Sequence, residues 1–98
     1  MDLNEIPFII YAEETPNPAS MKFVANKLLI VSGVSVEYTN ASETKHAPLP
    51  KAMFQFPFVK QVFITGNFVT ITKTANVEWE EIRNELRTFI TDYLNQGK

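Results

Sequence analysis

Apolar and polar residues alternate along several short stretches, with the period of two that is typical of strands with one buried face. Residues 34–38 show this most clearly, because Val34, Val36 and Tyr38 alternate with polar neighbours. Residues 59–64 and 68–72 are rich in β-formers and flank a short loop that carries Gly and Asn, which predicts a hairpin. Apolar stretches predict further strands at residues 6–12, 21–24 and 28–31.

A helical period replaces this alternation in the middle of the chain. Leu49, Ala52, Met53 and Phe56 fall at i, i+3, i+4 and i+7, so they predict one apolar face of a short helix. Two prolines stand near its start, where a missing N–H costs little, and we expect Pro57 to end it.

A longer helix is predicted at the end of the chain. Asn76 is a suitable N-cap, acidic residues follow it near the positive end of the helix dipole, and Gly97 is a natural stop. The apolar positions repeat at helical spacing and form one stripe. They are Trp79, Ile82, Leu86, Phe89, Ile90, Tyr93 and Leu94.

The order of these elements predicts an α+β fold. We expect a small two-layer domain in which a largely antiparallel β-sheet carries both helices on one face. Residues 40–45 are polar and predict a surface loop, and Ser32-Gly33 predicts a turn or a bulge. A chain of 98 residues has room for a single domain, which we place at residues 1–98.

Composition narrows the functional classes. Hydrophobic residues make up 45% of the chain and the net charge is only -2, which argues against disorder and against a basic nucleic-acid surface. The chain has no cysteine, which removes disulfides, thiol nucleophiles and thiolate metal ligands. No apolar run approaches the roughly 18 residues of a membrane span, and the sequence starts with acidic rather than basic residues. These features predict a cytoplasmic location.

Few residues suggest chemistry of their own. His46 is the only histidine and stands in a polar loop near Glu43, without a recognisable nucleophile, so a small enzyme is the weakest hypothesis. Glu13, Glu14 and Asp92 could bind iron weakly through oxygen, and a stand-alone carrier of this kind remains an alternative.

The aromatic residues leave two further alternatives open. Lysines scattered among phenylalanines could form a platform for single-stranded nucleic acid, but a sequence pI of about 5.3 favours core packing instead. Phe56 and Phe58 flank Pro57 at a helix-to-strand junction. They could form an exposed patch for a protein partner, although core packing is the stronger interpretation.

Residues 14–24 contain the most specific motif, Thr15-Pro16-Asn17-Pro18 followed by Lys22-Phe23. This segment resembles the signature of the N-terminal domain of Nfu-type (NifU-like) iron–sulfur scaffold proteins. Residues 47–54, 58–64 and 67–73, and the start of the last helix, are similar to the same domain in the same order. Ala47 departs from the Ser often found at this position of the family, which should cost about 1 kcal/mol of local stability.

The resemblance implies a non-catalytic accessory domain, not an enzyme, that assists cluster assembly and delivery. It implies that the iron–sulfur cluster is held by a Cys-x-x-Cys pair on a separate C-terminal domain, and that this segment holds no cofactor or metal. The expected partners are iron–sulfur apoproteins or cluster-assembly proteins, with no nucleic acid or membrane, and the isolated domain is expected to be a monomer. We favour a piece cut at a domain boundary over a solitary domain.

The signature motif has two physical interpretations. Two prolines reduce the freedom of the unfolded loop and Asn17 can set a turn through its own side chain, so the segment is either a rigid corner between strands or a preformed recognition edge. Lys22 alternates with apolar neighbours, so its charge should point outward. The candidate contact residues are Thr15, Pro16, Asn17, Pro18, Lys22, Phe23, Phe56 and Phe58.

Overall fold

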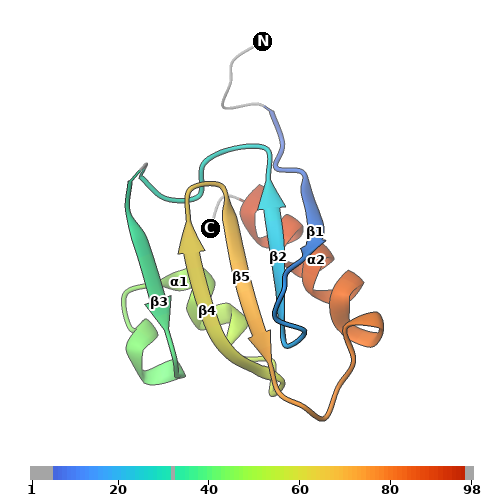
Figure 1. Cartoon of the computed structure of the whole chain (residues 1–98). Coiled ribbons are helices and arrows are strands. Elements are labelled where there is room, and N and C mark those ends of the chain that lie inside the picture. Colours follow the sequence, from blue (N-terminus) through green and yellow to red (C-terminus); the bar gives the residue numbers. More distant parts are fainter. Residues whose placement is uncertain (1–5, 32, 97–98) are drawn as a thin grey trace.

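A five-stranded antiparallel sheet forms one layer of the molecule, and both helices lie on the same face of it (Figure 1). The computed structural model describes residues 6–31 and 33–96. The strand order is β1-β2-β5-β4-β3. The α+β prediction is therefore confirmed. The elements are β1 Ile10–Glu14, β2 Ser20–Ala25, β3 Ser35–Tyr38, η2 Ala41–Thr44, α1 Pro48–Met53, β4 Val59–Thr65, β5 Phe68–Lys73 and α2 Trp79–Asn95.

The core lies between the sheet and the helices. Phe23 of β2 faces Val69 of β5, and Ile64 of β4 continues the same row, so each strand contributes alternate residues to one buried face. On α2, Leu86 and Ile90 are fully buried against this face. The predicted apolar stripe of the last helix thus forms one wall of the core.

The predicted hairpin is confirmed. β4 and β5 pair in antiparallel register, with Val62 opposite Ile71 and Thr65 opposite Phe68. Gly66 in the turn has φ of +56°, a left-handed conformation that glycine adopts without the penalty other residues carry.

The strand predicted at residues 28–31 is wrong, because this stretch connects β2 to β3 without pairing. β3 lies at the far edge of the sheet, so the connection must pass the ends of two intervening strands. The backbone N–H of Leu29 donates to the carbonyl oxygen of Gly66 at 2.9 Å, which anchors the connection to the hairpin turn. Leu29 and Ile30 pack against the core, whereas Leu28 and Val31 are exposed.

The first strand starts later than predicted, at Ile10 instead of residue 6. Two asparagine side chains hold the preceding segment. The amide of Asn95 binds both backbone groups of Phe8, and Asn26 binds the N–H of Ile9 and the carbonyl oxygen of Pro7. Side-chain amides thus replace the hydrogen bonds of a neighbouring strand here.

The helix boundaries also differ from the predictions. α1 begins at Pro48 as expected but ends at Met53, before the predicted limit. The N-cap of α2 is Glu78 instead of Asn76, and the Glu81 carboxylate accepts the Glu78 backbone N–H at 2.9 Å in a capping box. Asn76 precedes the cap position, and its side chain accepts a hydrogen bond from the Thr74 hydroxyl.

Two smaller predictions concern the polar segments. The predicted surface loop at residues 40–45 contains a short 3-10 helix, Ala41–Thr44. Of the predicted Ser32-Gly33 turn, Gly33 has φ of +86°, whereas Ser32 lies outside the described residues, as does the predicted stop at Gly97. Neither α1 nor α2 is long and apolar enough to cross a membrane, and the described ranges contain no other helix that is.

Candidate functional site

The signature motif forms the loop between β1 and β2, and its polar side chains close it internally. The Thr15 hydroxyl donates to the carbonyl oxygen of Asn17 at 2.9 Å and accepts the Asn17 N–H at 3.1 Å. The Asn17 side chain accepts the N–H of Ala19 at 2.9 Å, which is the turn that the sequence predicts. The loop is therefore a rigid corner whose prolines stay exposed.

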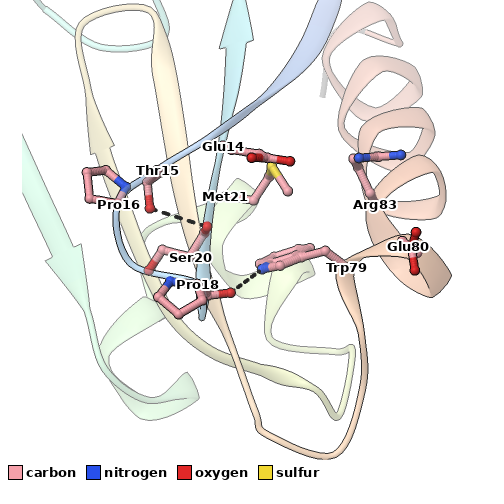
Figure 2. A pocket seen from close by; sticks show the side chains of 9 residues that line it. All are labelled: Glu14, Thr15, Pro16, Pro18, Ser20, Met21, Trp79, Glu80 and Arg83. Carbon is pink, nitrogen blue, oxygen red and sulfur yellow. Dashed lines mark hydrogen bonds between the residues drawn. The ribbon is translucent and has the colours of Figure 1, made fainter.

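Helix α2 braces this corner from outside the motif. The indole Nε1 of Trp79 donates to the carbonyl oxygen of Pro18 at 3.1 Å (Figure 2). The ring of Phe23 lies on the core side of the indole, with the two ring centroids 6.2 Å apart. The position of the loop is thus coupled to the first turn of α2.

A cavity of about 310 Å³ lies between the loop and the start of α2. We call it the signature pocket. Figure 2 shows that its walls come from three elements: the end of β1 with the loop, the start of β2, and the first turns of α2. Its lining residues are Glu14, Thr15, Pro16, Pro18, Ser20, Met21, Trp79, Glu80 and Arg83.

Three charged residues line the signature pocket. Glu14 comes from the end of β1, and Glu80 and Arg83 come from α2. Within residues 6–31 and 33–96 none of the three forms an ion pair within 4 Å, and the ion pair found there joins Lys22 to Glu13. The pocket is thus lined by two exposed carboxylates and one partly buried guanidinium, none of them in an ion pair among the described residues.

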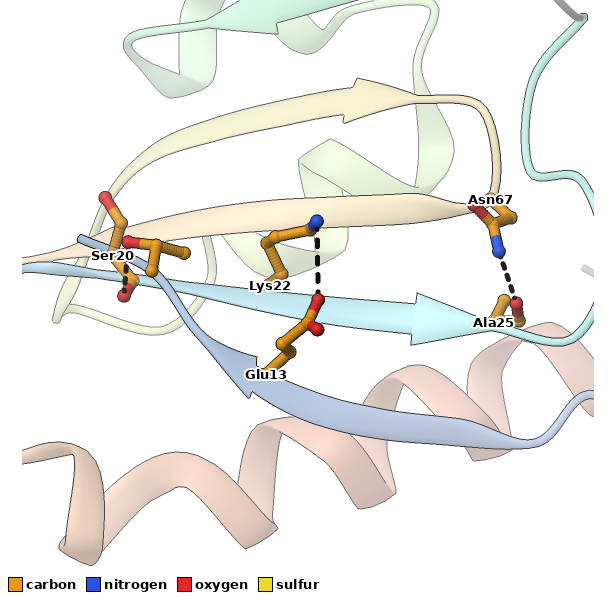
Figure 3. Close-up of polar contacts among 6 residues, drawn as sticks. Glu13, Ser20, Lys22, Ala25 and Asn67 are labelled. Atoms are coloured by element: carbon orange, nitrogen blue, oxygen red, sulfur yellow. Dashed lines mark hydrogen bonds and ion pairs between the residues drawn. The ribbon is translucent and has the colours of Figure 1, made fainter. Parts of the chain in front are cut away.

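Lys22 points to the face of the sheet opposite the helices, as its alternation with apolar neighbours predicts. Its ammonium group lies 3.3 Å from the Glu13 carboxylate (Figure 3). It also lies 4.2 Å from the centroid of the Phe68 ring. Phe23, the next residue, is fully buried, so we do not propose it as a contact residue. The residues of the signature therefore lie on two faces of the sheet, with the loop and the pocket on the helix side and Lys22 on the open side.

Phe56 and Phe58 lie apart from the signature pocket and are not among its lining residues. Their ring centroids are 5.4 Å apart, and Phe56 meets Phe89 of α2 edge-on at 5.1 Å. Both rings are half-buried and pack against the core. This agrees with the core-packing interpretation of the pair.

The other candidate residues do not assemble into a site. Glu13 binds Lys22, and Asp92 belongs to the last turns of α2. In the part of the chain that the structure describes, no three His, Asp or Glu side chains are grouped to hold a metal ion. Glu43 accepts the N–H of Thr39 at 2.7 Å, and His46 is exposed.

Trp79, Glu80 and Arg83 are the site residues that sequence reasoning missed. Trp79 and Pro18 are 61 positions apart, and the helical period assigned Trp79 to the core stripe. A second cavity of about 270 Å³ was also missed. It is mostly apolar and lies among α1, β3 and the end of α2.

Known proteins similar to this chain include relatives that are named as iron-sulfur cluster scaffolds. It is 34% identical over 88 residues to the NFU1 iron-sulfur cluster scaffold homolog, mitochondrial, of Drosophila erecta, covering 90% of this chain and 31% of that protein. It is 32% identical over 89 residues to NifU-like protein 5, mitochondrial, of Arabidopsis thaliana, covering 91% of this chain and 32% of that protein. The chain thus spans about a third of the length of these relatives.

These relatives correct one expectation. The predicted cytoplasmic location is wrong, because the relatives are named as mitochondrial proteins. The prediction rested on the acidic first residues, and these carry no information about the location of the protein.

One solved structure has a similar fold, and one family model matches most of the chain. The crystal structure of protein SAV1430 from Staphylococcus aureus superposes with a TM-score of 0.69 at 20% identity, over 85% of this chain and 96% of that one. At that identity the likeness shows the fold alone. The family model described as scaffold protein Nfu/NifU N terminal matches residues 10–97. The chain therefore belongs to the family of Nfu/NifU N-terminal domains.

Proposed function

We propose that this domain is a non-catalytic docking module of an iron–sulfur cluster scaffold. In this role it binds apoproteins or cluster-assembly proteins so that a cluster held elsewhere in the scaffold reaches its recipient. Membership of the scaffold family supports the iron–sulfur context. The names of the relatives support a mitochondrial location for the whole protein.

The observation that carries the docking role is the braced signature loop. Its hydrogen bonds and the Trp79 tether fix the loop before any partner arrives, so little conformational entropy is lost on binding. Pro16 and Pro18 stay exposed beside a cavity that is lined by charged residues. A rigid, exposed edge of this kind is suited to recognition, and it also forms a structural corner.

The chemistry of the chain supports cluster binding on a different domain. Thiolates are the usual ligands of iron–sulfur clusters, and this sequence has no cysteine. The chain matches about a third of its relatives' length, which leaves room there for a Cys-x-x-Cys domain. We propose that the cluster is cargo of that domain and that the present domain contributes contacts.

The test is a titration of isotope-labelled domain with purified cluster-accepting apoproteins and cluster-assembly proteins, followed by NMR. We expect shifts concentrated at residues 15–20 and 79–83. The Lys22→Met variant separates the two faces, because it changes the open sheet face and leaves the signature pocket intact. Absence of shifts with every partner would contradict the docking role.

A further inference from the structure

We propose that the signature pocket receives an arginine side chain from an extended segment of the partner protein. The inference rests on the proposed docking function and names the chemistry that the docking site recognises. It is carried by the charges, the aromatic wall and the rigidity of the cavity.

The charge balance of the pocket favours a cation. Glu14 and Glu80 contribute two carboxylates against the single guanidinium of Arg83, so one added positive charge neutralises the lining. Both glutamates are exposed, and neither carboxylate has an ion pair or a side-chain hydrogen bond among the residues described, so both are available to a ligand. Two neighbouring acids are already engaged: Glu13 with Lys22, and Glu81 with the backbone at the helix start.

The aromatic wall favours the same ligand. Trp79 is half-buried, with Phe23 behind it and its Nε1 tied to Pro18, so the indole is held in one orientation at the cavity wall. Cations bind over indole faces within about 6 Å of the ring centroid, because the π-system presents negative charge there. Pro16 and Met21 add apolar lining for the aliphatic stem of the ligand.

Arginine fits this combination better than lysine. A planar guanidinium stacks on an indole face and at the same time donates hydrogen bonds from its edge to a carboxylate. An ammonium group is a compact, strongly hydrated charge and does not combine the two contacts as well. The flanking exposed loop and the end of edge strand β1 leave space for the backbone of an extended segment.

The chain offers a direct probe, because Trp79 is its only tryptophan. The intact domain is titrated with a capped Gly-Gly-Arg-Gly-Gly peptide while Trp79 fluorescence and the indole N–H resonance are recorded. The control peptide carries citrulline, which keeps the shape of arginine and removes its charge. We expect saturable changes with arginine, weakened by salt, and about tenfold weaker binding of the citrulline peptide, the scale of a lost charged hydrogen bond.

Matched variants locate the site. Glu14→Gln and Glu80→Gln should each lower the affinity for the arginine peptide several-fold, at about the scale of a charge-assisted hydrogen bond. Glu85→Gln removes an exposed charge from the same helix outside the pocket and should leave the affinity unchanged. Equal binding of both peptides, or equal losses in all three variants, would overturn the inference.

The two proposals fail in different ways. If a partner protein binds the domain but its affinity is unaffected by Glu14→Gln and Glu80→Gln, the arginine pocket is rejected and the docking function stands. If the arginine peptide binds as expected but no iron–sulfur protein does, the pocket stands and the docking function is rejected.

Discussion

The indole Nε1 of Trp79 and the carbonyl oxygen of Pro18 lie 3.1 Å apart and form a hydrogen bond between residues 61 positions apart in sequence. The bond joins the first turn of α2 to a loop that otherwise satisfies its polar groups locally. Movement of the helix start is therefore transmitted to the loop. The tether also fixes the aromatic wall of the signature pocket.

Replacing Trp79 by Phe should destabilise the domain and release the loop. The variant loses one hydrogen bond, worth about 1 kcal/mol, and part of a large aromatic contact, worth about another 1 kcal/mol. Urea unfolding followed by circular dichroism measures the free energy of unfolding. Amide exchange at Ala19 and Ser20 should quicken more than exchange in β4.

Tyr93→Phe is the matched control for this prediction. It removes a hydroxyl from a half-buried aromatic residue of the same helix, and this hydroxyl has no hydrogen bond among the described residues. We expect a change within about 0.5 kcal/mol and no change in loop exchange. A loop that exchanges normally in Trp79→Phe would show that the tether does not hold it.

The capping box at the start of α2 gives a second prediction. Glu81→Ala removes the carboxylate that accepts the Glu78 N–H at 2.9 Å and should cost about 1 kcal/mol of unfolding free energy. Glu81→Gln keeps an acceptor at the same position and should restore most of that stability. Equal losses in the two variants, measured by urea unfolding, would assign the effect to charge instead of capping.

Features that depend on residues close in sequence were predicted, and features that depend on distant residues were not. The hairpin, the Asn17 turn and the stripe of α2 depend on residues within a few positions of one another, and the sequence predicts all three. The connection at residues 28–31 is apolar like a strand. Its path depends on where β3 lies in the sheet, which no local pattern encodes.

The signature pocket also depends on contacts that local sequence patterns do not predict. The motif identified the loop, since prolines and Asn17 are local signals. The pocket also needs Trp79, Glu80 and Arg83, which the fold brings to the loop from the far end of the chain. The helical stripe assigned Trp79 to the core, and its half-buried position at the stripe's end leaves it free to serve both packing and a cavity wall.

Lys22 should contribute to stability through the open face of the sheet. Its ammonium group pairs with Glu13 and lies over the Phe68 ring, but its side chain is 32% exposed, so solvent screens the charge. We expect Lys22→Met to cost at most about 1 kcal/mol. Salt should narrow the difference from wild type in urea unfolding, and a difference that salt leaves unchanged would point to packing alone.

The start of α1 lacks a side-chain cap. Its N-cap is Ala47, which cannot accept a hydrogen bond through its side chain. Ala47→Ser should therefore raise the free energy of unfolding by about 1 kcal/mol without affecting the signature pocket. Ala47→Val, which adds bulk but no acceptor, should bring no such gain, and equal effects of the two substitutions would contradict the capping explanation.

Cluster reconstitution tests the division of labour between domains. We expect the isolated domain to stay colourless when iron and sulfide are added under reducing conditions, because it has no thiolate and its described acidic residues form no three-membered metal group. The absorption spectrum after desalting should match that of the protein alone. Glu14→Gln is the control for weak oxygen ligation: iron retained by the wild type and lost in this variant would place metal in the signature pocket and contradict a contact-only role.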